Sequence, residues 1–176
     1  MHSTHLTADI GLLGGAGAGV CLCPTTERDL ADRIGPARQL VDAGSPLSLG
    51  SDSHAVIDLF EEARAVELDE RLRTEQRGHF SAAELLTAAT ATGHAAVGWP
   101  DAGRIEPGAP ADLVTVGLAN VRLAGTLPGP EVVFAATAAD VRHVVVSGRE
   151  VVRDGRHLLL GDVASQLASA VHALLD

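Results

Sequence analysis

Residues 46–54 have the sequence Pro-Leu-Ser-Leu-Gly-Ser-Asp-Ser-His, and this stretch decides the fold that we predict. Its first four residues form a short, mainly apolar run, as in a strand of a parallel sheet that is covered on both faces. Polar side chains follow at once, from Ser51 to His54. Enzymes built from parallel βα units keep their catalytic groups at this end of the strands. We therefore expect a functional site directly after this strand.

Similar elements precede and follow the strand. Val20 to Cys23 is another short apolar run, and a polar loop is expected from Thr25 to Asp32. Helices are predicted over residues 7–18, 34–43 and 56–73 and from residue 81 onward. The third of these is expected to bury an apolar side and expose its charges, and Ser81 and Glu84 form a capping box that begins the last. Helices and strands that alternate with short connections indicate parallel βα units, in a sheet or a barrel.

The second half of the chain has a different character. Residues 103–110 are rich in Gly and Pro. Strands are predicted over residues 112–116, 132–135 and 141–152, with a hairpin turn at Ser147-Gly148, and a closing helix over residues 158–175. We place a domain boundary near residue 101, between units that comprise residues 1–100 and residues 101–176.

Composition narrows the function. The 176 residues are 46% hydrophobic, which suffices for a sizeable core. The formal net charge of −10 argues against nucleic acid or an anionic membrane as a partner, so a small molecule is the expected substrate. All 13 basic residues are Arg, and without Lys the chain can form neither a Schiff base nor a carbamylated metal bridge. No signal-like start and no apolar stretch near about 18 residues are evident, which favours a cytoplasmic protein.

Asp52 is the strongest candidate for chemistry, because it directly follows a predicted strand. A carboxylate there can bind a metal ion and take a proton from metal-bound water. The alternative, a turn residue that accepts backbone hydrogen bonds, stays open. His2 lies 50 positions earlier, where a strand two βα units before would end, so both side chains could face one pocket. For His2, as for His5, a solvent-exposed position near the chain start is the plainer interpretation.

Five other polar residues at this edge could contact a substrate: Thr25, Thr26, Arg28, Ser53 and His54. Arg28 could hold a carboxylate through two hydrogen bonds, or it could pair with a neighbouring acid, Glu27 or Asp29, on a solvated loop. His54 could point the same way as Asp52 and shape the site without binding metal.

Cys21 and Cys23 lie on the first predicted strand. We expect them to point to opposite faces of that strand, which would exclude both a zinc pair and a disulfide between them. Cys23 is expected to pack near the rim of the pocket. With no disulfide framework, the cysteines also favour a reducing, cytoplasmic setting.

Three of these segments together resemble the sixth, seventh and eighth strand ends of the amidohydrolase superfamily: His2-Ser3-Thr4-His5-Leu6-Thr7, Cys23-Pro24-Thr25-Thr26-Glu27 and Gly50-Ser51-Asp52-Ser53-His54. Residues 89–93, 103–108 and 111–114 resemble the passage from the last barrel helix into the β domain of that superfamily, and residues 144–152 the hairpin that follows. Within the superfamily, residues 23–30, 34–37, 50–54 and 58–64 are most similar to the formimidoylglutamate deiminase family. The resemblance covers nearly the whole chain.

The resemblance implies an α/β fold in which this chain is the C-terminal part of a TIM (β/α)8 barrel of the metal-dependent hydrolase type. A small composite β-sandwich region and a C-terminal helix would follow. It also implies one zinc ion per site, with Asp52 as a metal ligand and proton acceptor and His2 as a catalytic histidine. The implied reaction hydrolyses N-formimino-L-glutamate to N-formyl-L-glutamate and ammonia, in histidine degradation. A homodimer of the complete enzyme is compatible with the resemblance.

The family pattern is incomplete in this sequence. No His-x-His pair precedes residue 52, and no strand carries the His and Glu that the fifth position of the barrel requires. We therefore expect the chain alone to be inactive as a fragment of the full enzyme. One alternative is another amidohydrolase deaminase, acting on an aminated heterocycle such as guanine or an adenosine derivative. The other is a non-catalytic truncated module that serves association.

Overall fold

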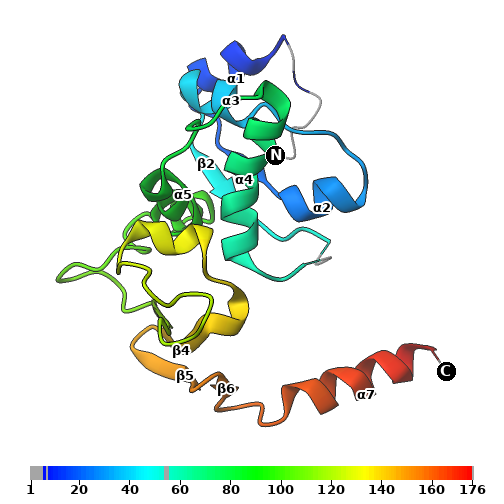
Figure 1. Ribbon diagram of the computed structural model, residues 1–176, viewed down its shortest axis with the longest axis vertical. Coiled ribbons are helices and arrows are strands. Elements are labelled where there is room, and N and C mark those ends of the chain that lie inside the picture. Colours follow the sequence, from blue (N-terminus) through cyan, green and yellow to red (C-terminus); the bar gives the residue numbers. More distant parts are fainter. Residues whose placement is uncertain (1–5, 7, 54–55, 176) are drawn as a thin grey trace.

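The computed structural model describes residue 6 and residues 8–53 and 56–175 of the chain. Its N-terminal part packs helices around a two-stranded parallel sheet. Its C-terminal part contains a four-stranded antiparallel sheet and ends in a helix that extends away from the body (Figure 1). The predicted α/β character is confirmed. Among the described residues, the parallel strands form a pair and not a closed barrel.

The parallel pair consists of β1 (Val20–Leu22) and β2 (Leu47–Leu49), at the two places where apolar runs predicted strands. Cys21 pairs with Ser48 in the middle of the register. The chain crosses from β1 to β2 through the helices α2 (Pro24–Asp29) and α3 (Ala37–Asp42). Because both strands run in the same direction, the residues that follow them meet at one edge of the pair.

One face of the strand pair packs against helices and forms the core. The helices are α1 (Ile10–Gly15), α3, α4 (Leu59–Thr74) and α5 (Ala82–Ala89), with α6 (Ala91–Ala96) following α5. Val20 and Leu22 join a buried cluster with Leu40, Val66 and Leu85 from three of these helices. Each fully buried side chain of this size contributes about 1.5–3 kcal/mol relative to an exposed one. The strand ends are therefore fixed on a packed base.

The polar run after β1 was expected to be a loop, and this expectation is wrong because residues 24–29 form α2. Pro24 occupies the start of the helix, where its missing N–H costs nothing. The carboxylate of Glu27 accepts a hydrogen bond from the backbone N–H of Cys23 at 3.1 Å. Glu62, on α4, accepts one from the N–H of Thr25 at 3.0 Å. Two carboxylates thus satisfy amide groups that the first turn of a helix leaves free.

The expected division of α4 into an apolar buried side and a charged exposed side is confirmed only for its apolar side, where Ala63, Ala65 and Val66 are buried. Glu62, Glu67 and Glu70 are fully buried, whereas Leu72 is 75% exposed. Each of the three carboxylates accepts backbone N–H groups from other segments: Thr25 for Glu62, Gly78 and Phe80 for Glu67, and Arg38 for Glu70. Buried polar groups persist where such partners are present. Helix α5, by contrast, has the predicted capping box of Ser81 and Glu84.

The antiparallel sheet contains β3 (Leu113–Val116), β4 (Val141–Val146), β5 (Arg149–Arg153) and β6 (Arg156–His157), in that order. The predicted hairpin is confirmed, with Ser147 at φ 49° and Gly148 at φ 77°, the left-handed pair of a tight hairpin turn. The strand predicted over residues 132–135 is wrong. A 3-10 helix, η1 (Pro130–Phe134), is found there instead, and its Val133 packs into the core of the N-terminal part. A second short turn, η2 (Ala138–Asp140), leads into β4.

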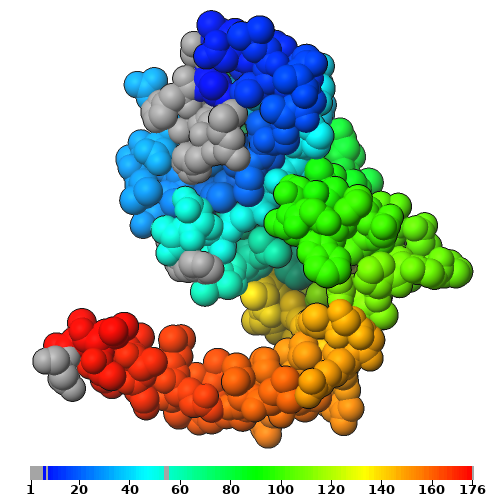
Figure 2. Space-filling model, turned by 180° about the vertical axis from the view of Figure 1, so that it is seen from behind, coloured from blue at the N-terminus to red at the C-terminus, as the bar shows by residue number. Residues whose placement is uncertain are grey.

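The last helix, α7 (Val163–Leu175), begins later than predicted. Asp162 caps its start, because the carboxylate accepts hydrogen bonds from the N–H and the hydroxyl of Ser165. All of its described residues are exposed, and it projects from the body as an arm (Figure 2). Within the described part of the chain, no helix combines the length and apolarity that a membrane crossing requires.

Glu67 closes the turn between α4 and α5. Its carboxylate accepts hydrogen bonds from the N–H groups of Gly78 and Phe80 and forms an ion pair with Arg71 at 2.6 Å. Burial by itself would raise the pKa of Glu67, but the hydrogen bonds from Arg71, Phe80 and Gly78 lower this pKa overall. The ionised form is therefore the one that stabilises the turn.

Replacing Glu67 by Gln should destabilise the chain by about 1–3 kcal/mol, because charge-assisted hydrogen bonds to buried partners are weakened. Urea unfolding at neutral pH measures the change. The stabilisation is fully present above the unfolded-state pKa of about 4.3 and is lost as the pH falls through the lower folded-state pKa. Glu75→Gln, at an exposed position after α4, is the control and should change stability by less than about 0.5 kcal/mol. Equal effects of the two substitutions would contradict this role for Glu67.

Candidate active site

Asp52 lies in the loop that follows β2, at the edge where both parallel strands end. Its backbone φ is 43°, in the left-handed region that residues other than Gly seldom adopt. The residue is exposed. The carboxylate at this edge is therefore accessible from solvent.

Thr26, on α2, contacts both neighbours of Asp52. Its hydroxyl donates a hydrogen bond to the carbonyl oxygen of Ser51 at 3.0 Å and accepts one from the N–H of Ser53 at 3.1 Å. Thr26 is 0% exposed. The sequence indicated Thr26 as a polar group that could contact a substrate, but no local pattern indicates that α2 turns its second Thr toward a loop 25 positions away.

Thr25 is buried and is held by Glu62. Both the N–H and the hydroxyl of Thr25 donate hydrogen bonds to this carboxylate. Burial raises the pKa of Glu62, and the hydrogen bonds from Thr25 offset only part of that effect. The hydroxyl of Thr25 is thus engaged inside the protein, where it fastens α2 to α4.

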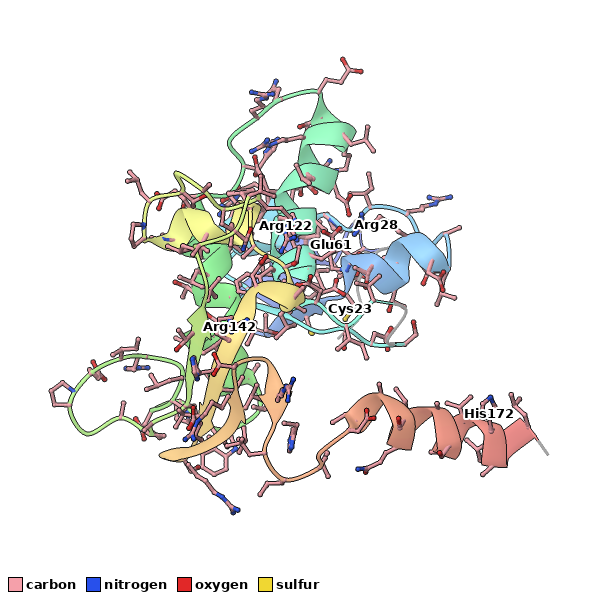
Figure 3. The ribbon with its side chains drawn as sticks, turned by 60° about the horizontal axis from the view of Figure 1, so that its bottom comes forward. Cys23, Arg28, Glu61, Arg122, Arg142 and His172 are labelled. Atoms are coloured by element: carbon pink, nitrogen blue, oxygen red, sulfur yellow. The ribbon has the colours of Figure 1, made fainter. Side chains whose placement is uncertain are left out.

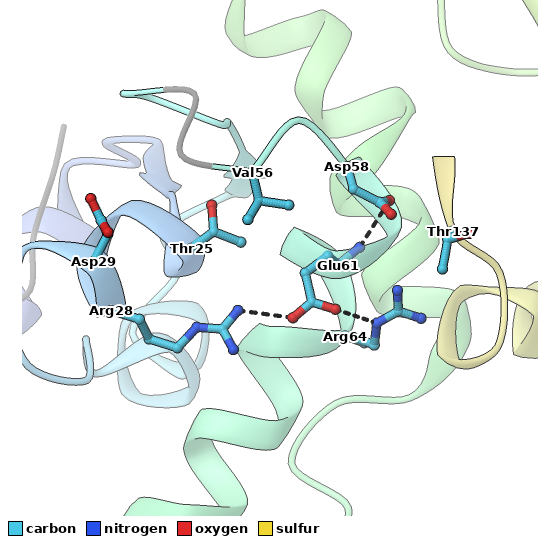
Figure 4. Close-up of a pocket in the computed structure, with 8 residues that line it drawn as sticks. All are labelled: Thr25, Arg28, Asp29, Val56, Asp58, Glu61, Arg64 and Thr137. Atoms are coloured by element: carbon cyan, nitrogen blue, oxygen red, sulfur yellow. Dashed lines mark hydrogen bonds and ion pairs between the residues drawn. The ribbon is translucent and has the colours of Figure 1, made fainter. Parts of the chain in front are cut away.

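A pocket of about 580 Å³ lies between α2, the start of α4 and η2 (Figure 4). It is lined by Thr25, Arg28, Asp29, Val56, Asp58, Glu61, Arg64 and Thr137. Glu61 is at its centre, with Arg28 at 3.0 Å and Arg64 at 2.8 Å. Hydrogen bonds from Arg64 and then Arg28 lower the pKa of Glu61. The polar wall of the pocket is therefore built from mutually paired charges.

The structure brings together only part of the predicted site. Thr25 and Arg28 line the pocket, whereas Asp52 and Ser53 are not among its lining residues. Thr26 connects the two groups through its contacts to Ser51 and Ser53. His2, His5 and His54 lie outside the described residues. Arg28 and Glu61 occupy the same region as Cys23, whereas His172, on α7, lies far from them (Figure 3).

Cys21 and Cys23 point to the same side, so the expectation that they face opposite sides is wrong. Side chains alternate along a strand, and residues two apart therefore share a face. A Cβ atom on Gly50 would lie 3.2 Å from the Sγ of Cys23 and 3.3 Å from the Sγ of Cys21. The hydrogen bond between the two thiols lowers the pKa of Cys21 to about 6 and raises the pKa of Cys23. Both are free thiols, and the absence of a side chain at Gly50 leaves the space that they occupy.

The described residues do not form a metal site by themselves. In residue 6 and residues 8–53 and 56–175, no three His, Cys, Asp or Glu side chains come together in a way that could hold a metal ion. Asp52 offers one carboxylate, whereas protein zinc sites use three or four protein ligands. A metal bound at Asp52 would need ligands from beyond this described part.

Comparison with known proteins identifies the family. Residues 1–151 match the amidohydrolase family, and the chain belongs to this family. It is 36% identical to a formimidoylglutamate deiminase of Pseudomonas aeruginosa, over all of this chain and 41% of that protein. It is 32% identical to a 5-methylthioadenosine/S-adenosylhomocysteine deaminase of Haloarcula marismortui, over 98% of this chain and 41% of that protein. The chain thus spans about two fifths of the length of these relatives.

Solved structures agree with this assignment. An amidohydrolase from Brucella melitensis superimposes with a TM-score of 0.85 at 29% identity, over 99% of this chain and 40% of its own. An adenosine deaminase from Xanthomonas campestris with bound zinc superimposes with a TM-score of 0.86 at 28% identity, over 96% of this chain and 40% of its own. The relatives named as deaminases are hydrolytic enzymes that act on C–N bonds.

Glu62 and Glu67 are both buried on α4, yet their pKa values move in opposite directions, so substitution by Gln should have opposite pH dependence. With a raised folded-state pKa, Glu62 contributes stability below its unfolded pKa of about 4.3, and this is lost as the pH rises through the folded-state pKa. The uncharged Gln still accepts the N–H of Thr25. Relative to the wild-type chain, Glu62→Gln should therefore gain stability as the pH rises from about 4 to 7. The deficit of Glu67→Gln should instead develop below about pH 4.3, as the pH rises through the lowered folded-state pKa, and should stay constant above it. Unfolding free energies from about pH 2 to pH 7 measure both trends, and parallel trends would contradict the assignment.

Proposed function

We propose that this chain forms the part of a metal-dependent amidohydrolase that carries strands six to eight of its barrel, and that the complete enzyme hydrolytically removes ammonia from a C–N bond. In this proposal, residues 1–100 belong to the barrel, and residues 101–176 form the small β domain with its terminal helix. Support comes from the family match over residues 1–151 and from the deaminases among the relatives.

The placement of Asp52 is the single observation that carries the proposal. Asp52 follows β2 and is exposed. Hydrogen bonds with the hydroxyl of Thr26 hold the residues before and after it, Ser51 and Ser53. At this position a carboxylate can accept a proton from the attacking water molecule, a role that contributes about 10²–10⁴-fold to a rate in other enzymes. Water would add to the carbon of the C=N bond, and Asp52 would take one of its protons, to be passed on to the nitrogen. The second proton would reach the nitrogen as the C=O bond forms and the C–N bond breaks, so that the nitrogen leaves as ammonia.

We propose zinc as the metal of the complete site, because a zinc-bound deaminase superimposes on this chain. Asp52 is the ligand that the described residues would supply, and the remaining ligands would come from other strands. His2, at the predicted end of the sixth strand, would help to orient and stabilise the attack of water. When bound, such an ion acts as a Lewis acid and lowers the pKa of bound water.

We propose N-formimino-L-glutamate as the substrate, and the composition of the pocket supports this choice. The lining contains two Arg and no aromatic ring. A glutamate skeleton needs cationic groups for its carboxylates, and Arg suits planar carboxylates. Arg28, whose side chain is 48% exposed, is the accessible cation, with Thr25 beside it. Ser53 and His54 would contact the formimino end of the substrate, next to Asp52.

A second candidate is deamination of an adenosine derivative. Several 5-methylthioadenosine/S-adenosylhomocysteine deaminases match this chain at 32–35% identity, close to the 36% of the formimidoylglutamate deiminase. For this substrate, surfaces that stack on the purine ring would have to come from parts of the enzyme other than the described pocket lining.

A chimaera tests the function. Residues 1–176 replace the matching segment of the Pseudomonas aeruginosa formimidoylglutamate deiminase, and ammonia release is measured with N-formimino-L-glutamate and, separately, with 5-methylthioadenosine. Turnover of the first supports the leading proposal, and turnover of the second alone supports the second candidate. A folded, zinc-loaded chimaera that acts on neither substrate would contradict both.

In this chimaera, Asp52→Asn should lower kcat by about 100-fold or more, because the amide cannot accept the proton. Asp101→Asn is the matched control, since Asp101 is an exposed acid that does not line the pocket. It should retain kcat within about threefold. Near-normal turnover of Asp52→Asn would refute the role of Asp52.

A further inference from the structure

The hydroxyl of Thr26 has its hydrogen-bonding capacity filled by the two residues that flank Asp52. A Thr hydroxyl donates once and accepts twice. Thr26 donates to the carbonyl oxygen of Ser51 at 3.0 Å and accepts from the N–H of Ser53 at 3.1 Å. Its oxygen also lies 3.0 Å from the Oγ of Ser53. Because the Thr26 proton already points to Ser51, the hydroxyl of Ser53 is the donor in this third contact. One side chain thus holds the backbone on both sides of Asp52.

The conformation of Asp52 is one that such contacts select. A φ of 43° is left-handed, a region that few residues with a side chain adopt, although Asp tolerates it better than most. An exposed loop without tertiary contacts would relax toward more common backbone conformations. The carboxylate direction would then change with the backbone, because the side chain follows the Cα–Cβ bond.

Thr26 itself is rigidly placed. It is 0% exposed, in the first turn of α2. That turn is fixed from two sides, since Glu27 accepts the N–H of Cys23 and Glu62 accepts the N–H of Thr25. The support therefore runs from α4 through Glu62 and α2 to the hydroxyl of Thr26 and on to the loop of Asp52.

We propose that Thr26 is a positioning residue that fixes the left-handed conformation of Asp52 and thereby aims its carboxylate at the reacting atoms. The second half of this statement rests on the proposed function. The first half concerns the loop alone and is tested without catalysis.

A Val at position 26 would fill nearly the same volume as Thr but would leave the carbonyl of Ser51 and the N–H of Ser53 without this partner. The hydroxyl, and not the volume of the side chain, is the feature that matters.

Hydrogen exchange on the 176-residue chain and on the chimaera tests the loop. Thr26→Val should speed exchange of the Ser53 amide about tenfold, the effect of losing about 1.4 kcal/mol of protection. In Thr26→Ser, which keeps the hydroxyl, the exchange rate of the Ser53 amide should stay within about threefold of the wild-type rate. Thr74→Val is the matched control, because its hydroxyl donates to Glu70 on α4, away from the loop. It should leave the Ser53 amide unchanged.

Kinetics of the chimaera test the positioning. Thr26→Val should lower kcat by about 100-fold with KM within about threefold, because a displacement of about 1 Å can cost this much in a catalytic group. Thr26→Ser should restore kcat. Unchanged Ser53 exchange in Thr26→Val would overturn the first half of the proposal. Faster exchange with an unchanged kcat, or a loss confined to KM, would overturn the second half. A chimaera without activity would contradict both the proposed function and the claim that Thr26 aims the carboxylate. The exchange data would still decide whether Thr26 fixes the conformation of Asp52.

Discussion

The buried contact between Glu62 and Thr25 is the interaction on which the arrangement of the strand ends depends. It joins the 16-residue helix α4 to the first turn of α2, across 37 positions of sequence. Without this carboxylate, α2 would lose the partner of an amide in its first turn and its attachment to α4. The pKa of Glu62 is raised because burial disfavours its ionised form by more than the hydrogen bonds from Thr25 favour it. The contact therefore contributes fixed geometry more than stability.

The two faces of the parallel pair have different composition, and this difference fits the barrel proposal. On the helix side, Val20 and Leu22 are almost fully buried. On the other side, the strands carry Cys21 and Ser48 in one register position, with Gly50 just beyond. In a barrel, alternate residues of each strand face the interior, and small residues there leave room below the catalytic edge. A two-stranded parallel sheet would otherwise leave both outer edges unpaired, which isolated proteins avoid.

Much of the fold could be predicted from local sequence, and the failures share one physical cause. Both parallel strands, the capping box at Ser81 and the hairpin at Ser147-Gly148 depend on neighbouring residues, and each was predicted. Helix α2, the buried acids of α4 and η1 depend on partners far away in sequence, which local patterns do not contain. The site follows the same division. Asp52 could be proposed from its place after a strand, whereas the contacts of Thr26 with the neighbours of Asp52 became visible only when α2 was placed beside that loop. The error about the cysteines differs, since residues two apart on a strand always share a face.

The charges around Glu61 limit which residue could bind an anionic substrate. Arg28 and Arg64 both pair with this carboxylate, so each of these two cations already has a counter-ion. A substrate carboxylate would have to replace Glu61 at one of them. The pair with Arg28 is partly exposed, and pairs of this kind are worth about 0–1 kcal/mol. Arg64 is only 12% exposed and also donates to the carbonyl oxygen of Ala136 at 2.8 Å, which ties α4 to the segment after η1. Separation of Arg28 from Glu61 would therefore cost little, whereas separation of Arg64 would disturb its contact with the segment after η1. Under the proposed function, Arg28 is thus the cation that could change partners for a substrate carboxylate.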